Sequence, residues 1–304
     1  MKQIKIGNKF YAGAIALGAM RMAGKSDSEA DRIVKTCVDR GVNFFDHADI
    51  YGGGESEAVF GRVLGLNPGL REKLFIQGKV GICKGFYDAS YKHIMEAAEG
   101  CLNRLGIECF DTLLLHRPDA LMQPEEVAEA FSRLEEQGKA KYFGVSNENA
   151  VQLQLLDKFL PGKIIINQLQ FSLCHTILVD EGVNVNIHSP HAQVLSGGVL
   201  DYCRLKDITV QAWSPFQYGM FEGAFIDNEK FAGLNDALND VAQKYGVTKS
   251  AIAVAWILRH PANIQPIVGS MNPERLKDIL AGGDIELTRE EWYKLYLAAG
   301  NPLP

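Results

Sequence analysis

The feature that most constrains the fold is a repeated alternation between short apolar runs and longer stretches with a helical period. The runs are almost continuously apolar, as in DTLLLH and KIIIN, which is typical of parallel strands covered by protein on both faces. Each run is followed by enough chain to form a helix. The predicted strands span residues 14–20, 43–48, 74–80, 111–116, 142–146, 164–171, 208–214 and 264–270.

Helix signals fall between these runs. Ser26 and Glu29 match a capping box, in which a hydroxyl and a carboxylate bind free backbone N–H groups, and Thr288 and Glu291 repeat the pattern. Pro124 suits the first turn of a helix. In several of these stretches apolar residues recur at i, i+3, i+4 and i+7, the spacing of one buried helix face.

Strand–helix units repeated through 304 residues predict an α/β fold, a single (β/α)8 TIM barrel in which residues 1–304 form one domain. The rival is an open, doubly wound sheet, which usually carries a glycine-rich phosphate motif. Gly13 and Gly18 have the spacing of one such motif, but Ala19 stands where its lysine belongs. The barrel is therefore favoured.

Three further segments of the sequence can be placed in the predicted barrel. The segment KIGNKF before the first strand is predicted to form a β-hairpin that closes the bottom of the barrel. Residues 173–195 and 216–231 are longer than minimal connections and are predicted to be loops. Because they follow strands, they belong to the C-terminal face, where barrel enzymes have their active sites.

Charge and composition exclude several classes of protein. A formal net charge of −6 argues against a general nucleic-acid binder, and no apolar run approaches the roughly 20 residues that span a bilayer. The N-terminus does not resemble a signal peptide, so we expect a cytoplasmic protein with reduced thiols. His188 and His191 lack a third ligand nearby, so no metal site is predicted.

Ionisable and polar side chains end three consecutive predicted strands. Asp46 and Tyr51 follow the second strand, Lys79 lies in the third, and His116 ends the fourth. In a barrel these groups converge on one mouth. An unpaired ammonium inside a barrel is costly, and Asp46 is the obvious partner of Lys79.

At these residues the sequence resembles the aldo-keto reductase superfamily. The matching segments are GVNFFDHADIYG, FIQGKVG, DTLLLHRPD and GKAKYFGVSN, and HRPDALMQPEEVAEAF is similar to a bacterial, short-looped oxidoreductase branch. The resemblance extends from LGAMRM to GSMNPER. It implies a barrel that binds NADPH across its C-terminal face and reduces an aldehyde or ketone to an alcohol by hydride transfer. A small-molecule carbonyl substrate is implied, with neither nucleic acid nor membrane as a partner.

The resemblance assigns a catalytic tetrad of Asp46, Tyr51, Lys79 and His116. Tyr51 would give its proton to the carbonyl oxygen and take it back in the reverse direction. We expect Lys79 to lower the pKa of Tyr51, because a nearby cation favours the phenolate. Asp46 would keep Lys79 charged, and His116 would hydrogen-bond the carbonyl oxygen.

The resemblance also implies cofactor contacts. Gln168 matches a group that binds the nicotinamide carboxamide, Trp213 an aromatic ring that stacks on the nicotinamide, and Arg275 a guanidinium that holds the adenosine 2′-phosphate. The implied positions are Gly18, Ala19, Met20, Ser146, Asn147, Gln168, Trp213, Ser214, Pro215, Phe216, Ser270, Arg275 and Asp278.

Two positions depart from the family pattern. Gly269 stands where many members have a lysine, and Ile279 replaces an amide that usually contacts adenine. NADPH remains favoured, with NADH as an alternative, and Lys277 is a candidate for partial compensation. Two other functions also stay open: a lysine-dependent aldolase using Lys79, and a regulatory subunit that binds the cofactor without turning over a substrate.

Overall fold

Eight parallel strands form a closed barrel in the order β10-β3-β4-β5-β6-β7-β8-β9. The structure, a computed structural model, describes residues 1–188 and 192–304, so His191 lies outside the described residues. The barrel confirms the predicted fold class. Its strands are β3 (Ala16–Gly18), β4 (Phe44–Asp46), β5 (Phe75–Val80), β6 (Phe110–Leu115), β7 (Ala140–Ser146), β8 (Ile164–Gln170), β9 (Thr209–Trp213) and β10 (Gln265–Val268).

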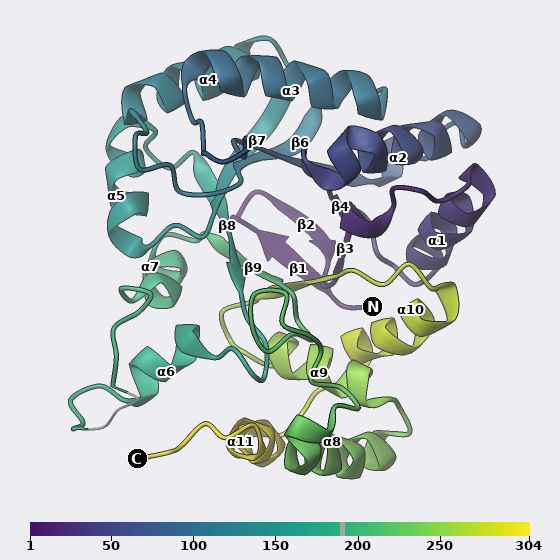
Figure 1. Cartoon of the computed structure of the whole chain (residues 1–304), viewed down its shortest axis with the longest axis vertical. Helices are drawn as coiled ribbons and strands as arrows, with labels where there is room; N and C mark the ends of the chain where they lie inside the picture. The colour runs from purple at the N-terminus through teal and green to yellow at the C-terminus, as the bar shows by residue number, and fades with distance from the viewer. Residues whose placement is uncertain (189–191) are drawn as a thin grey trace.

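The predicted hairpin is also present, as strands β1 (Gln3–Ile6) and β2 (Phe10–Gly13) paired antiparallel. In Figure 1 it lies across the middle of the ring of helices. The Gly7 N–H donates to Thr209 Oγ1 at 2.9 Å, and the Phe10 ring stacks on Phe75 with centroids 4.4 Å apart. Because Thr209 and Phe75 begin their strands, the hairpin covers the N-terminal end of the barrel, away from the strand ends that carry the candidate site.

Helices surround the strands (Figure 1). Both predicted capping boxes form, at Ser26 before α1 and at Thr288 before α11, and Pro124 occupies the first turn of α4. The helices are α1 (Asp27–Asp39), α2 (Glu55–Leu66), α3 (Tyr91–Leu105), α4 (Pro124–Glu136), α5 (Ala150–Phe159), α6 (Ile177–Val183), α7 (Val199–Leu205), α8 (Ala232–Tyr245), α9 (Lys249–Leu258), α10 (Pro273–Leu280) and α11 (Arg289–Ala298).

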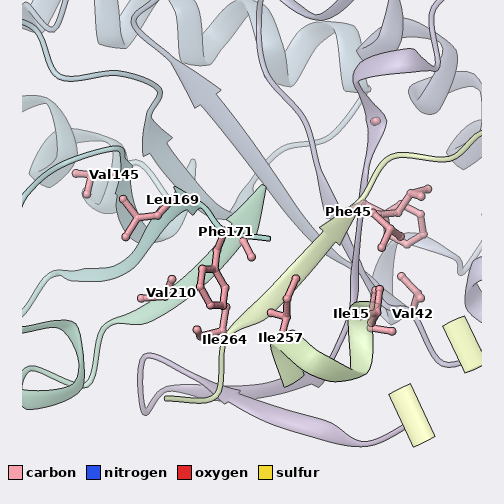
Figure 2. Packing of buried hydrophobic residues seen from close by; sticks show 14 of the residues in the cluster. Ile15, Val42, Phe45, Val145, Leu169, Phe171, Val210, Ile257 and Ile264 are labelled. Carbon is pink, nitrogen blue, oxygen red and sulfur yellow. The ribbon is translucent and has the colours of Figure 1, made fainter. Parts of the chain in front are cut away.

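The largest apolar core lies between the strands and the helices. Figure 2 shows part of it, with Val145, Leu169 and Val210 from three neighbouring strands and Ile257 from α9. These side chains are buried, as expected for strands that face helices on the outside of a barrel. The strands that carry the polar strand-end residues are therefore packed against helices on their outer side.

The two predicted loops contain structure of their own. Residues 173–195 include helix α6, so their assignment as a continuous loop was wrong. Side-chain hydrogen bonds hold helix α6 in place. Thr176 Oγ1 donates to Asp180 Oδ2 at 2.8 Å, and Tyr296 Oη donates to Asp180 Oδ1 at 2.6 Å. In the second segment, Gln217 pairs with Ala224 in an isolated antiparallel bridge.

The described helices include none that combines the length and the apolar character needed to cross a membrane.

The packing of α4 on the barrel yields a stability prediction. Phe131 is fully buried and stacks on Phe143 of β7, with centroids 4.3 Å apart. We expect Phe131→Ala to lower the free energy of unfolding by about 3–5 kcal/mol through lost burial and a residual cavity. Urea unfolding followed by circular dichroism measures the change. In the control Leu205→Ala, at a side chain that is 82% exposed on α7, the change should stay within about 0.5 kcal/mol. Equal effects in the two variants would contradict the assignment of Phe131 to the core.

Candidate active site

A cleft of about 1550 Å³ opens at the C-terminal ends of the barrel strands. Of the residues assigned from the sequence, Ala19 and Lys79 do not line it, and both are fully buried. The others line the cleft: Gly18, Met20, Asp46, Tyr51, His116, Ser146, Asn147, Gln168, Trp213, Ser214, Pro215, Phe216, Ser270, Arg275 and Asp278. The fold therefore brings these distant sequence segments to one surface.

Tyr51 is placed by a tight turn that follows β4. It begins the short 3-10 helix Tyr51–Gly54, in which Gly52 and Gly53 have φ of 60° and 65°. Glycine tolerates this left-handed backbone, so the chain can turn sharply enough to return the phenol to the barrel mouth. The ring centroid of Tyr51 lies 5.9 Å from that of His116, with the planes at 83°.

Lys79 and Asp46 form the predicted ion pair beneath Tyr51. Lys79 Nζ lies 2.5 Å from Asp46 Oδ1 and donates to the backbone carbonyl of His47 at 2.9 Å. The same ammonium nitrogen is 4.9 Å from the centre of the Tyr51 ring. Both members of the pair are buried, so each charge depends on the other and on hydrogen bonds for compensation.

Glutamine side chains inside the barrel form hydrogen bonds to this ion pair and to one another. Gln77 Nε2 donates to Asp46 Oδ1 at 2.6 Å and to Gln211 Oε1 at 2.8 Å. Gln168 Nε2 donates to the same two oxygens, each at 3.1 Å. Asp46 Oδ1 thus accepts from one ammonium and two amides, which fixes the carboxylate.

The role of Gln77 and Gln211 was missed in the sequence. A signal existed, because Gln77 and Lys79 are two residues apart in an otherwise apolar strand and so share its inner face. The pairing of Asp46 with Gln77 in the β4–β5 register then brings the two side chains together.

The electrostatics of the tetrad differ in part from expectation. Burial alone would lower the pKa of Lys79, but Asp46 and Tyr51 raise it above its usual value, so the lysine is charged. Burial raises the pKa of Tyr51 above its usual value, and this outweighs the lowering effect of Lys79. The predicted lowering effect of Lys79 on the pKa of Tyr51 is therefore present, but it does not decide the direction of the shift because the phenol is buried more deeply than the sequence implied.

His116 is a neutral imidazole at neutral pH. Burial, followed by the positive charges of Lys79 and Arg117, holds the pKa of His116 well below its usual value. Its Nδ1 is buried without a hydrogen-bond partner among the described residues. A neutral ring with a free nitrogen can hydrogen-bond a carbonyl group without carrying charge.

Amide groups and an indole form the next part of the cleft. Trp213 Nε1 donates to Asn147 Oδ1 at 3.1 Å, Asn147 Nδ2 donates to Ser146 Oγ at 2.8 Å, and Ser146 Oγ donates to the Gln168 carbonyl at 2.9 Å. Asn147 and Ser214 have φ of 63° and 51°, a left-handed backbone conformation that residues other than glycine rarely adopt. Such strain tends to persist at functional sites.

The far end of the cleft carries cations. Arg275 is exposed near the start of α10, and Arg21 Nη1 donates to the Gly269 carbonyl at 3.2 Å. A β-carbon built at Gly269 would lie 3.2 Å from that same nitrogen. The Arg21 guanidinium therefore lies where a side chain at residue 269 would begin. Lys277 pairs with Glu274 at 3.0 Å and is not among the residues that line the cleft.

Comparison with known proteins identifies the family of the chain. Residues 14–296 match the Aldo/keto reductase family. The chain is 34% identical to the uncharacterized oxidoreductase YcsN of Bacillus subtilis, with 98% of each chain covered. It is 32% identical to a 6-dehydroglucose reductase of Agrobacterium fabrum, again with 98% of each covered, and 35% identical to the oxidoreductase YdhF of Escherichia coli, with 86% of this chain and 84% of YdhF covered.

Solved structures share the fold. An aldo-keto reductase from Klebsiella pneumoniae in complex with NADPH superposes with a TM-score of 0.80 at 24% identity, over 100% of this chain and 96% of that one. The family match, the full-length relatives and the barrel agree: the chain belongs to the aldo/keto reductase family of oxidoreductases.

Proposed function

We propose that this protein catalyses NADPH-dependent reduction of an aldehyde or ketone to an alcohol, with Tyr51 as the general acid. The observation that carries the proposal is the position of Tyr51 and His116 in the cleft, directly above the buried pair of Lys79 and Asp46. A carbonyl oxygen between the phenol and the imidazole would meet two hydrogen-bond donors, which is what a developing negative charge requires.

The cleft residues fit a dinucleotide phosphate. The amide of Asn147 accepts from Trp213, and Gln168 lines the same cleft, a set suited to an aromatic carboxamide. Arg21 and Arg275 also line the cleft and suit phosphate oxygens, and we infer that Arg21, bonded to the Gly269 carbonyl, supplies the cation that Gly269 lacks. When bound, NADPH supplies the hydride that reduces the carbonyl carbon.

The residues of the chain would manage the proton. Tyr51 donates its hydroxyl proton to the substrate oxygen, and in the reverse direction the phenolate takes that proton back. Lys79, kept charged by Asp46, stabilises the phenolate that remains after transfer. Neutral His116 hydrogen-bonds the same oxygen and orients the substrate. Asp46 acts through Lys79 and is a positioning residue.

The aldolase alternative is disfavoured by the same charges. Schiff-base formation needs an unprotonated amine, whereas Asp46 and Tyr51 hold the pKa of Lys79 above its usual value. A regulatory subunit would bind NADPH and leave every carbonyl unreduced, so turnover assays on aldehydes and ketones separate it from the reductase.

The first test is Tyr51→Phe. Removing the proton donor should reduce kcat for NADPH-dependent carbonyl reduction by about 10²–10⁴-fold while NADPH binding persists. Loss of reduced-nicotinamide absorbance measures the rate, and quenching of protein fluorescence measures binding. The matched control is Tyr11→Phe, because Tyr11 is 60% exposed on the hairpin at the opposite end of the barrel. Full activity in Tyr51→Phe would exclude Tyr51 as the acid.

A second test concerns the coupling between Lys79 and Tyr51. Lys79 lowers the pKa of Tyr51, so Lys79→Met should raise that pKa. Alcohol oxidation needs the phenolate and increases with pH, so its pH profile should shift to higher pH. The amides of Gln77 and Gln168 still donate to Asp46 in this variant, and circular dichroism verifies that it is folded. The readout is kcat for oxidation against pH, with Lys139→Met, on the salt bridge to Glu99, as the control. A profile that stays in place would show that Lys79 does not tune Tyr51.

A third test concerns the cofactor phosphate. Because NADH lacks the 2′-phosphate, Arg275→Gln should weaken NADPH binding by about tenfold or more and leave NADH binding unchanged, since a charged hydrogen bond contributes about 1.5–3 kcal/mol. Fluorescence titration with each nucleotide gives both dissociation constants. Arg133→Gln, on the exposed side of α4, is the control. Equal weakening of NADPH and NADH would assign Arg275 to another part of the cofactor.

A further inference from the structure

A second group of reactive side chains lies outside the tetrad, in the segment that joins β5 to α3. Among the described residues, Cys83, Asp88 and His93 bring one sulfur, one oxygen and one nitrogen within 4.8 Å of one another. All three side chains are half-buried, so they are ordered by the fold and still accessible to small solutes. Their spacing, C-x4-D-x4-H, is not one of the common metal motifs, and the sequence analysis did not single it out.

Two of the three side chains come from a small hairpin formed by residues 81–88. The Cys83 N–H donates to the Phe86 carbonyl at 2.9 Å, and the Asp88 N–H donates to the Gly81 carbonyl at 3.0 Å. Ile82 pairs with Tyr87 between these two bonds. In a hairpin, paired residues share a face and successive residues alternate. Cys83 and Asp88 therefore lie on the face opposite Ile82 and Tyr87, with Gly81 leaving room between them.

The two faces of this hairpin have different surroundings. Ile82 and Tyr87 line the cleft that contains Tyr51, so their face belongs to the substrate side. The other face meets the start of α3. There Ser90 caps the helix by accepting from the His93 N–H at 3.3 Å, and the Ser90 N–H donates to Asp88 Oδ1 at 2.9 Å. These bonds fix the helix start that carries His93 beside Cys83 and Asp88.

The ligand distances are close to those of a metal site. Cys83 Sγ is 3.8 Å from His93 Nε2 and 4.0 Å from Nδ1. In a tetrahedral zinc site, bond lengths of about 2.0–2.3 Å place neighbouring ligand atoms roughly 3.4–3.6 Å apart. Small side-chain rotations would therefore close the group around an ion.

The electrostatic environment favours a cation. Asp49, from the loop after β4, has a buried Oδ1 without a partner among the described residues, and burial raises the pKa of Asp49 to about 6. The carboxylates of Asp49 and Asp88 would attract a divalent ion, and the ion would stabilise the Cys83 thiolate. The neighbouring cation Arg104 is already paired with Glu57 at 2.7 Å.

We propose that Cys83, Asp88 and His93 bind one zinc-class divalent cation, which ties the hairpin of residues 81–88 to the start of α3. A thiolate, an imidazole and a carboxylate form a ligand set suited to Zn²⁺, and a water molecule would complete the tetrahedron. The ion lies behind the substrate face, so its role is to hold Ile82 and Tyr87 in place. This proposal is independent of the reaction assigned to Tyr51.

The test is Zn²⁺ binding to the full-length protein. Protein stripped with a chelator is titrated with Zn²⁺ against a chromophoric chelator, and native mass spectrometry gives the stoichiometry. We expect one Zn²⁺ per chain. Cys83→Ser and Asp88→Asn should each weaken binding by at least about a hundredfold, since partners outside the ligand shell alone contribute 10–100-fold. Asn at position 88 retains an oxygen that can accept from Ser90. The control Cys109→Ser, at another half-buried thiol, should bind as the unmodified chain does.

Two further measurements keep the outcome decisive. Co²⁺ should give a near-ultraviolet thiolate charge-transfer band that disappears in Cys83→Ser, and Zn²⁺ should slow amide hydrogen exchange in residues 81–93. Circular dichroism verifies that each variant is folded. Substoichiometric binding by the unmodified protein, or the same Zn²⁺ affinity in folded Cys83→Ser, would overturn the proposal.

Discussion

The buried ion pair between Asp46 and Lys79 is the interaction on which the geometry of the site depends. Two charges removed from water are tolerated only when each is compensated, and one oxygen of Asp46 accepts from Lys79, Gln77 and Gln168. The pair joins β4 to β5, and the segments that follow these two strands carry Tyr51 and the hairpin of residues 81–88. Two segments that line the cleft therefore start from strands that this pair joins in the barrel interior.

The charge on Lys79 also acts on both side chains that would meet the substrate. It lowers the pKa of His116 and lowers that of Tyr51, but burial has opposite effects on the two groups. For the imidazole, burial and the cation act together, and the ring is neutral. For the phenol, they oppose each other, and burial prevails. A single lysine thus favours a neutral hydrogen-bonding histidine while it makes a buried tyrosine more acidic than burial alone would leave it.

The presence of eight strands alternating with helices could be predicted from the sequence, because apolar runs and capping boxes are local signals. The strand ends were less accessible: three predicted strands run two residues past the observed ends at Gly18, Asp46 and Val268. The contacts of Gln77 and Lys79 could be predicted only in part. Alternation shows that they share a face. Gln211, which accepts from Gln77, and Gln168, which donates to Asp46 and Gln211, lie far along the chain and join this group only through barrel closure. The direction of the Tyr51 pKa shift depends on burial, which no local pattern records. Helix α6 was missed because its seven residues are too few for a clear period.

The barrel divides its tasks between strands and the segments that follow them. Proton transfer requires atoms placed within a fraction of an ångström, and Asp46 and Lys79 sit on paired strands that supply this precision. Substrate selection requires surfaces that can differ among relatives while the chemistry stays the same. The hairpin of residues 81–88 meets that requirement because its own backbone hydrogen bonds hold it together. Under the proposed function, its cleft face could change at Ile82 and Tyr87 without disturbing the ion pair, and the proposed metal site would anchor its rear face at Cys83 and Asp88.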